Sequence, residues 1–168
     1  GLGMTSKNPQ QTGVLMSHFT GPMVPPVEPA VSNFTLLHGY NGDEVGNVQF
    51  PLGRDADDID PRMAKAARRL IVTVEKIVPH EQIIPQPNLT YIPHTWVEAI
   101  VEAPFGAHPL SCDGYYDEDE EHMYYYQECS KPGRFAEYAD KYIYGTKDHW
   151  DYLQKALTPQ QIFALSVR

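Results

Sequence analysis

The sequence predicts an α/β fold with an open, mainly parallel sheet and a C-terminal helical segment. Three observations support this fold class. Short apolar runs rich in strand-forming residues alternate with a helical pattern across residues 33–103. The run at residues 70–78 is almost continuously apolar and β-branched, which is typical of a strand covered on both faces in a parallel sheet. From residue 117 onward the apolar spacing changes to a helical period.

The first part of this pattern predicts a strand, a loop, a short strand and a helix. Residues 33–40 form an apolar run that ends in a polar, glycine-containing loop, and a short strand resumes at residues 47–50. A helix is predicted over residues 60–70, because Asp60 suits the N-cap and Pro61 suits the first helical position. The predicted apolar face of this helix consists of Met63, Ala66, Ala67 and Leu70.

The strand at residues 70–78 follows this helix directly. Residues 91–103 then offer either a pair of strands or one strand interrupted at Pro93, since proline cannot donate a ladder hydrogen bond. Within this stretch, residues 97–103 are interpreted as a buried strand. The turn after it therefore falls at the C-terminal end of a strand, where open α/β sheets bind their ligands.

Four helices are predicted after the sheet. Thr158 and Gln161 have the spacing of a capping box, which marks the start of the last helix. The acidic run that precedes the first helix suits the positive end of a helix dipole. Phe135, Tyr138 and Tyr142 recur at helical spacing, which favours core packing over ligand binding. The predicted helices cover residues 118–130, 133–145, 148–157 and 158–167.

Length, charge and cysteine content exclude several classes of function. The 168 residues carry a formal net charge of -9, which argues against nucleic acid or an anionic membrane as a partner. The sequence has no apolar run long enough to span a bilayer, and two cysteines are too few for a disulfide framework, so we expect a cytoplasmic protein. Residues 1–32 are interpreted as an irregular connecting segment, the remnant of a longer N-terminal part, and residues 33–168 as the folded domain.

Residues 101–122 hold the densest group of chemically reactive side chains. His108 and Cys112 could meet at a metal ion only if this stretch were helical, and Pro109 and Gly114 oppose a helix, so no metal site is predicted. A Cys112 nucleophile with His108 as its base stays open beside the simpler interpretation of a small buried cysteine. No catalytic residue is assigned from the residues alone.

Four segments carry a resemblance to a known family. They read "LLHGYNGDEVGNVQF", "DPRMAKAARRLIVTVEKIVP", "IPHTWVEAIVEAPFGAHPLSCDGYYDEDEEH" and "YIYGTKDHWDYLQK", and together they extend over most of residues 33–155. With these segments the chain resembles the alpha (A) subunits of family I CoA-transferases such as glutaconate CoA-transferase. A Gly-Leu-Gly at residues 1–3 is similar to a loop of the same subunits.

The resemblance implies the α/β fold of the CoA-transferase superfamily and the movement of CoA between carboxylic acids. Acyl-CoA and carboxylates would be the substrates, and no further cofactor is implied. In the two-subunit enzymes a glutamate of the beta (B) subunit carries CoA as a thioester, so we expect a hetero-oligomer in which this chain supplies no nucleophile. The substrate-binding residues that the resemblance implies are Gly3, Asn47, Gly106, Ala107 and His108.

Two departures from the family pattern leave alternatives open. The loop at residues 41–44 lacks the basic residue that family members commonly carry there, and the glycine-rich part that opens these subunits is missing before Gly1. One alternative is a subunit of a CoA-thioester hydrolase that opens a ring in steroid degradation. The other is a non-catalytic scaffold subunit. Because fold does not decide chemistry, the sequence of the partner would separate these interpretations.

Overall fold

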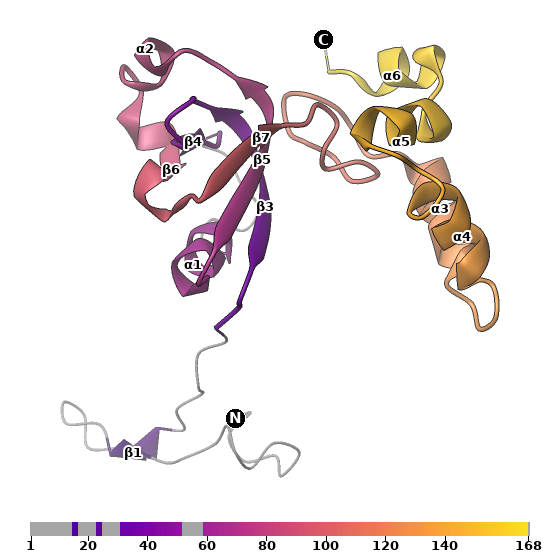
Figure 1. Ribbon diagram of the computed structural model, residues 1–168, viewed down its shortest axis with the longest axis horizontal. Coiled ribbons are helices and arrows are strands. Elements are labelled where there is room, and N and C mark those ends of the chain that lie inside the picture. The colour runs from indigo at the N-terminus through magenta and orange to yellow at the C-terminus, as the bar shows by residue number, and fades with distance from the viewer. Residues whose placement is uncertain (1–14, 17–22, 25–30, 52–58, 168) are drawn as a thin grey trace.

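In the computed structural model the chain forms a five-stranded sheet and a group of C-terminal helices (Figure 1). The structure describes residues 15–16, 23–24, 31–51 and 59–167. Apart from the main sheet, β1 (Leu15–Met16) pairs with β2 (Met23–Val24) in antiparallel fashion. The strands of the main sheet are β3 (Thr35–Gly42), β4 (Val48–Gln49), β5 (Leu70–Ile77), β6 (Thr90–Ile92) and β7 (Ala99–Glu102).

The sheet has the strand order β6-β4-β3-β5-β7. β5 is parallel to both β3 and β7, whereas β4 is antiparallel to both β3 and β6. Four of the five strands therefore point the same way, and the predicted open, mainly parallel α/β sheet is confirmed. The reversed strand follows from the short connection after β3, because a chain can return alongside itself through a tight turn only in the antiparallel sense.

One face of the sheet forms the core. Leu37 on β3 lies beside Val72 on β5, and both are buried together with Val48 and Phe50. The helix α1 (Ile59–Ala66) packs against β3 and places Ala64 in this core. The opposite face carries alternate residues of β3 and β5, so it receives the side chains that the core excludes.

Two predicted elements differ from the structure. The helix predicted over residues 60–70 ends at Ala66, and Leu70 is instead the first, buried residue of β5. The prediction of a buried strand over residues 97–103 is wrong, because β7 covers only Ala99–Glu102 and lies at the edge of the sheet with Val101 half exposed. Among the described strands β7 pairs only with β5, so its outer side has no neighbouring strand among them.

Short helical turns occupy the connection between β5 and β7. They bring the chain from the C-terminal end of β5 back to the edge strand β6 and then across to β7. These turns are α2 (His80–Ile83), η3 (Pro87–Leu89) and η4 (His94–Trp96).

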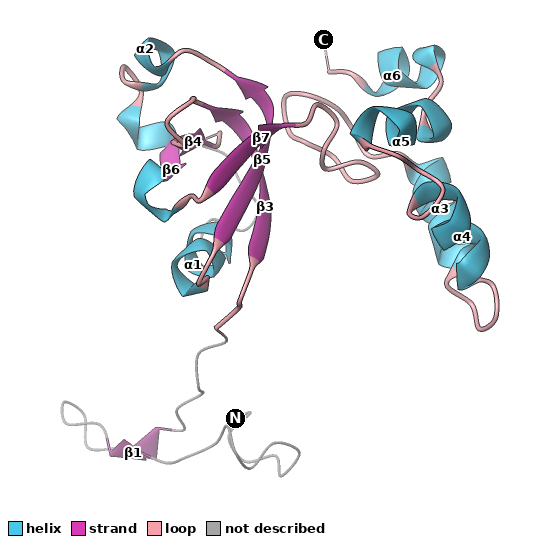
Figure 2. Ribbon diagram, in the orientation of Figure 1, coloured by secondary structure: helices cyan, strands magenta, loops and turns pink. Residues whose placement is uncertain are grey.

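The four C-terminal helices form within the predicted ranges, beside the sheet (Figure 2). Asp119 caps the first and Asp148 caps the third, each accepting a hydrogen bond from a backbone N–H three residues on. The predicted capping box of Thr158 and Gln161 is confirmed. The bounds are α3 (Glu120–Cys129), α4 (Phe135–Tyr142), α5 (His149–Ala156) and α6 (Pro159–Leu165). In the part of the chain that the structure describes, every helix is too short or too polar to cross a bilayer.

Candidate functional site

A cleft of about 1120 Å³ opens beside β3. Its walls come from β3, from the start of α1 and from the β7–α3 loop (residues 103–119), which folds back over β3 and β5. His38, Tyr40, Cys112 and Tyr116 all line it. A smaller cavity of about 510 Å³ lies between α3 and α6, but its walls include the whole acidic run 117–121, which would repel a phosphate-bearing ligand.

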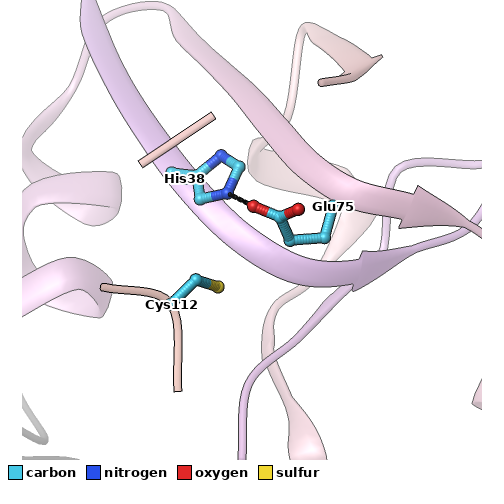
Figure 3. A group of neighbouring side chains, drawn as sticks. All are labelled: His38, Glu75 and Cys112. Carbon is cyan, nitrogen blue, oxygen red and sulfur yellow. Dashed lines mark hydrogen bonds and ion pairs between the residues drawn. The ribbon is translucent and has the colours of Figure 1, made fainter. Parts of the chain in front are cut away.

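Glu75 is the buried acid beneath this cleft. It projects from β5 and has only 6% of its surface exposed. Its Oε1 lies 2.6 Å from His38 Nε2 and accepts a hydrogen bond of 2.6 Å from the Tyr116 hydroxyl. Its Oε2 accepts a 2.8 Å hydrogen bond from the backbone N–H of Phe105. Figure 3 shows the His38 and Glu75 side chains meeting above the Cys112 sulfur.

These hydrogen bonds determine the charge of Glu75. Burial alone would raise the pKa of this carboxyl, but the hydrogen bonds from His38, Tyr116 and Phe105 outweigh it and hold the pKa below its usual value. Because an ionised carboxylate can only accept hydrogen bonds, His38 Nε2 carries the hydrogen and donates the hydrogen bond to Glu75. The other ring nitrogen, Nδ1, lies 2.8 Å from the Thr73 hydroxyl, which fixes the orientation of the imidazole.

The turn at residues 104–109 lies directly on this network. A Cβ at Gly106 would come within 2.6 Å of Cε1 in the His38 ring and 2.7 Å of the Ala103 carbonyl oxygen, so only glycine fits here. Phe105 takes a left-handed backbone conformation with φ of 58°, and its ring stacks on Tyr116 with centroids 4.2 Å apart. The Tyr116 hydroxyl accepts a 2.9 Å hydrogen bond from Ala107 N–H.

His108, two residues further on, points away from the cleft and into the helices. Its Nδ1 lies 2.7 Å from the Tyr152 hydroxyl and its Nε2 lies 3.1 Å from Asp119 Oδ2. Burial lowers the pKa of His108, although the Asp119 carboxylate opposes this shift. The neutral ring therefore donates from Nε2 to Asp119 and accepts from Tyr152. Next to it, His122 packs edge-on at 5.0 Å between ring centroids and bonds to Tyr138.

Comparisons with known proteins agree with this architecture. The family model described as "Coenzyme A transferase" matches residues 22–103. The alpha (A) subunit of glutaconate CoA-transferase from Acidaminococcus fermentans is 36% identical over 121 residues, which are 71% of this chain and 37% of the relative. The crystal structure of glutaconate coenzyme A-transferase from the same organism superposes with a TM-score of 0.84 at 31% identity, over 94% of this chain and 49% of that one. By these comparisons the chain is similar to the coenzyme A transferase family.

Two further relatives of this chain have different substrates in their names. The alpha (A) subunit of 3-oxoadipate CoA-transferase from Pseudomonas knackmussii is 32% identical over 143 residues, covering 82% of this chain and 47% of the relative. The cholesterol ring-cleaving hydrolase IpdA subunit of Rhodococcus jostii is 30% identical over 130 residues, covering 75% of this chain and 43% of the relative. The chain spans less than half the length of these curated relatives.

The substrate-binding residues predicted from the sequence do not form one group. Ala107 lines the cleft, and Gly106 packs on the His38 ring beside it. His108 lies behind the turn with both ring nitrogens bonded within the chain. Asn47 belongs to the loop after β3, where its side chain bonds to Asp43 and to the backbone of residue 94. Gly3 lies outside the described residues.

Glu75, His38 and Tyr116 were not singled out by sequence reasoning. Glu75 did carry a signal, because a carboxylate inside an otherwise apolar parallel strand must be paired or hydrogen-bonded once it is buried. His38 also sits within an apolar strand run. The role of Tyr116 had no local signal, since it depends on the β7–α3 loop folding back over β5.

Cys112 lies in the same cleft but is not poised as a nucleophile. It is buried, and burial together with the nearby Glu75 carboxylate raises the pKa of its thiol to about 12. Two trios of side chains have metal-ligand types within 4.8 Å of one another: His38, Glu75 and Cys112, and His108, Asp119 and His122. Among the described residues every buried side-chain nitrogen and oxygen has a hydrogen-bond partner, so the nitrogen and oxygen atoms of both trios already take part in hydrogen bonds within the chain.

Proposed function

We propose that this chain is part of the alpha (A) subunit of a two-subunit CoA-transferase that moves CoA between carboxylic acids. Acyl-CoA and free carboxylates are the substrates, and coenzyme A enters as substrate rather than as a bound cofactor. Two of the curated relatives are named as alpha (A) subunits of CoA-transferases, which supports both the reaction and a beta (B) partner in a hetero-oligomer.

The observation that carries the proposal concerns Cys112 and Glu75, the two described side chains at or beneath the cleft that could act as nucleophiles, because neither is free to attack a thioester. The Cys112 thiol stays protonated at neutral pH, and Glu75 is committed to three hydrogen-bond donors. A ping-pong transfer needs a carboxylate that is free to attack the thioester carbonyl. We therefore assign the glutamate that carries CoA as a thioester to the beta partner, and we assign to this chain the shaping of the acyl pocket.

Within this pocket we propose a wall formed by the 104–109 turn. Gly106 and Ala107 present backbone and a small side chain to the substrate, while His108 holds the turn from behind through Tyr152 and Asp119. Asn47 shapes the loop after β3, and Gly3 stays a substrate-binding residue that only the resemblance implies. The exposed edge of β7 is the surface that we propose for contact with the partner. The free thiols of Cys112 and Cys129 suit a reducing cytoplasm.

The test is CoA exchange with and without the beta subunit. The alpha subunit is purified by itself and together with a candidate beta subunit, and each preparation is incubated with an acyl-CoA and acetate. We expect acetyl-CoA to form only with the complex. Robust turnover by the isolated alpha subunit would contradict the assignment of the nucleophile to the partner.

A CoA-thioester hydrolase subunit is the second candidate, because the cholesterol ring-cleaving hydrolase subunit is also similar to this chain. The same assay separates the two reactions. A transferase requires the acceptor carboxylate and produces a new CoA thioester, whereas a ring-opening hydrolase consumes its thioester with water and ignores acetate. A complex that assembles but has neither activity would favour the third interpretation, a non-catalytic scaffold subunit.

A further inference from the structure

We propose that Glu75 is a positioning residue that fixes the 104–109 turn against the sheet and thereby sets the wall of the acyl pocket. This inference rests on the proposed function for its catalytic consequence. Its structural content rests only on hydrogen bonds and backbone geometry among described residues. Glu75 itself is too deeply buried to touch a substrate.

The first step is the number of anchors that converge on one carboxylate. Glu75 Oε2 binds the turn directly through Phe105 N–H at 2.8 Å. Oε1 binds it indirectly, since it accepts from the Tyr116 hydroxyl at 2.6 Å and that hydroxyl accepts from Ala107 N–H at 2.9 Å. Two alternate backbone amides of the turn are therefore tied to a single side chain on β5.

The second step is that the turn needs such anchors. Phe105 adopts a left-handed backbone conformation with φ of 58°, which is strained for a non-glycine residue and persists only when its surroundings impose it. The anchor at Phe105 N–H lies on this residue, and the next residue, Gly106, has no Cβ and so allows the turn to approach the His38 ring. Without Glu75 the local backbone would relax away from the sheet.

The third step is the need for a carboxylate rather than an amide. All three groups that face Glu75 donate hydrogen bonds: an imidazole N–H, a phenol O–H and a backbone N–H. An ionised carboxylate satisfies them all, whereas a glutamine would turn its own NH₂ group toward one of these donors. Charge-assisted hydrogen bonds are also stronger than neutral ones, and Glu75 must hold the turn against its backbone strain.

The experiment uses two variants and a matched control in the assembled complex. Tyr116→Phe breaks the link to Ala107 while leaving Glu75 in place, and Glu75→Gln disturbs both anchors. Tyr115→Phe is the control, because Tyr115 is the neighbouring residue and its hydroxyl bonds to Asn41 rather than to the turn. Amide hydrogen exchange of residues 104–109 is measured first. Steady-state kinetics are measured second, with kcat and KM expressed per assembled complex.

We expect Tyr116→Phe to speed exchange at Ala107 by about 3–10-fold, as the loss of one net hydrogen bond implies. Glu75→Gln should speed it at both Phe105 and Ala107. Both variants should lower kcat/KM by about tenfold or more, because a displaced wall misplaces the bound thioester. The control should change either quantity less than about twofold, as expected for a change outside the turn. A purely stabilising role would instead lower the yield of complex and leave kcat/KM of the surviving complex unchanged.

The outcomes separate this inference from the proposed function. Exchange in the turn that matches the Tyr115→Phe control would overturn the positioning role, whatever the kinetics show. Faster exchange with an unchanged kcat/KM would overturn the claim that the turn forms the pocket wall. If the wild-type complex has no transferase activity, the proposed function fails, yet the exchange data still decide whether Glu75 holds the turn.

Discussion

At the scale of single residues, Glu75 and Cys112 show opposite effects of one buried environment. Both are almost fully buried and lie close together, Cys112 in the wall of the cleft and Glu75 beneath it. Glu75 receives three hydrogen bonds and stays ionised, whereas its negative charge and the burial of the thiol keep Cys112 protonated. The carboxylate thus suppresses the reactivity of the sulfur beside it.

We therefore predict that Cys112 is structural. Cys112→Ser in the assembled complex should keep turnover within a few-fold, because no reaction step uses the sulfur. The native thiol should also react with a disulfide reagent at about pH 8 far more slowly than a free cysteine, since the thiolate is the reactive form. A fall in turnover of several orders of magnitude would instead identify Cys112 as a nucleophile.

His108 gives a second prediction at this scale. Its ring nitrogens bond to Tyr152 and Asp119, so His108→Gln and Tyr152→Phe should both lower the melting temperature, by roughly 2–4 °C for each kcal/mol lost. The kcat/KM of the assembled complex should fall much less than in Tyr116→Phe or Glu75→Gln. An unchanged melting temperature with a large loss of kcat/KM in His108→Gln would show that the ring contacts substrate.

At the scale of secondary-structure elements, the features that depend on neighbouring residues could be predicted from the sequence. The capping box of Thr158 and Gln161 and the acidic start of α3 were predictable because a cap and its helix lie within a few residues. The exposed position of β7 was not, since strand order depends on pairings between distant segments. Ala107 could be placed at the cleft because it follows the end of a strand. Its anchors Glu75 and Tyr116 could not be predicted, because their contacts join segments that are far apart in the sequence.

The two aspartate caps provide a prediction for these elements. Asp148 caps α5 only, but Asp119 caps α3 and also accepts from His108. Asp148→Ala should destabilise the protein by about 1 kcal/mol, as is usual for an N-cap. Asp119→Ala should cost about 1.5–3 kcal/mol more, because a hydrogen bond to a charged group is also lost.

Urea unfolding followed by the helical circular dichroism signal measures both losses. Asp119→Asn serves as the matched variant, since asparagine retains the cap but removes the charge that faces His108. It should fall between the wild type and Asp119→Ala. Equal losses for the two alanine variants would show that the link between α3 and the 104–109 turn adds no stability.

At the scale of the whole molecule, burial has shifted many pKa values, and the shifts limit the stable pH range from both sides. Burial lowers the pKa of His108 and His122, so the unfolded chain binds more protons and stability falls as the pH drops below about 6.5. For Asp43, Glu75 and Asp119, hydrogen bonds outweigh burial and depress the pKa. Their contribution is present above about pH 4 and is lost below it.

At alkaline pH the effect on stability has the opposite sign, because the relevant pKa values are raised. Burial raises the pKa of Cys112 and of Tyr40 to about 12, and it raises the pKa of Tyr152 as well. These groups contribute stability below their unfolded pKa values, about 8.5 for the thiol and about 10 for the phenols. That contribution disappears as the pH rises toward the folded values, because the unfolded chain then loses its protons first.

The free energy of unfolding of the complex should therefore be greatest between about pH 7 and 8.5 and should fall on both sides. Urea titrations at a series of pH values measure this curve. His122→Gln removes one of the two buried imidazoles and leaves the cleft unchanged, so it should flatten the decline that begins near pH 6.5 without altering the alkaline limb. A stability maximum on the acid side, near pH 5, would mean that the buried histidines are protonated in the folded protein and that their charge, rather than their burial, stabilises the helices.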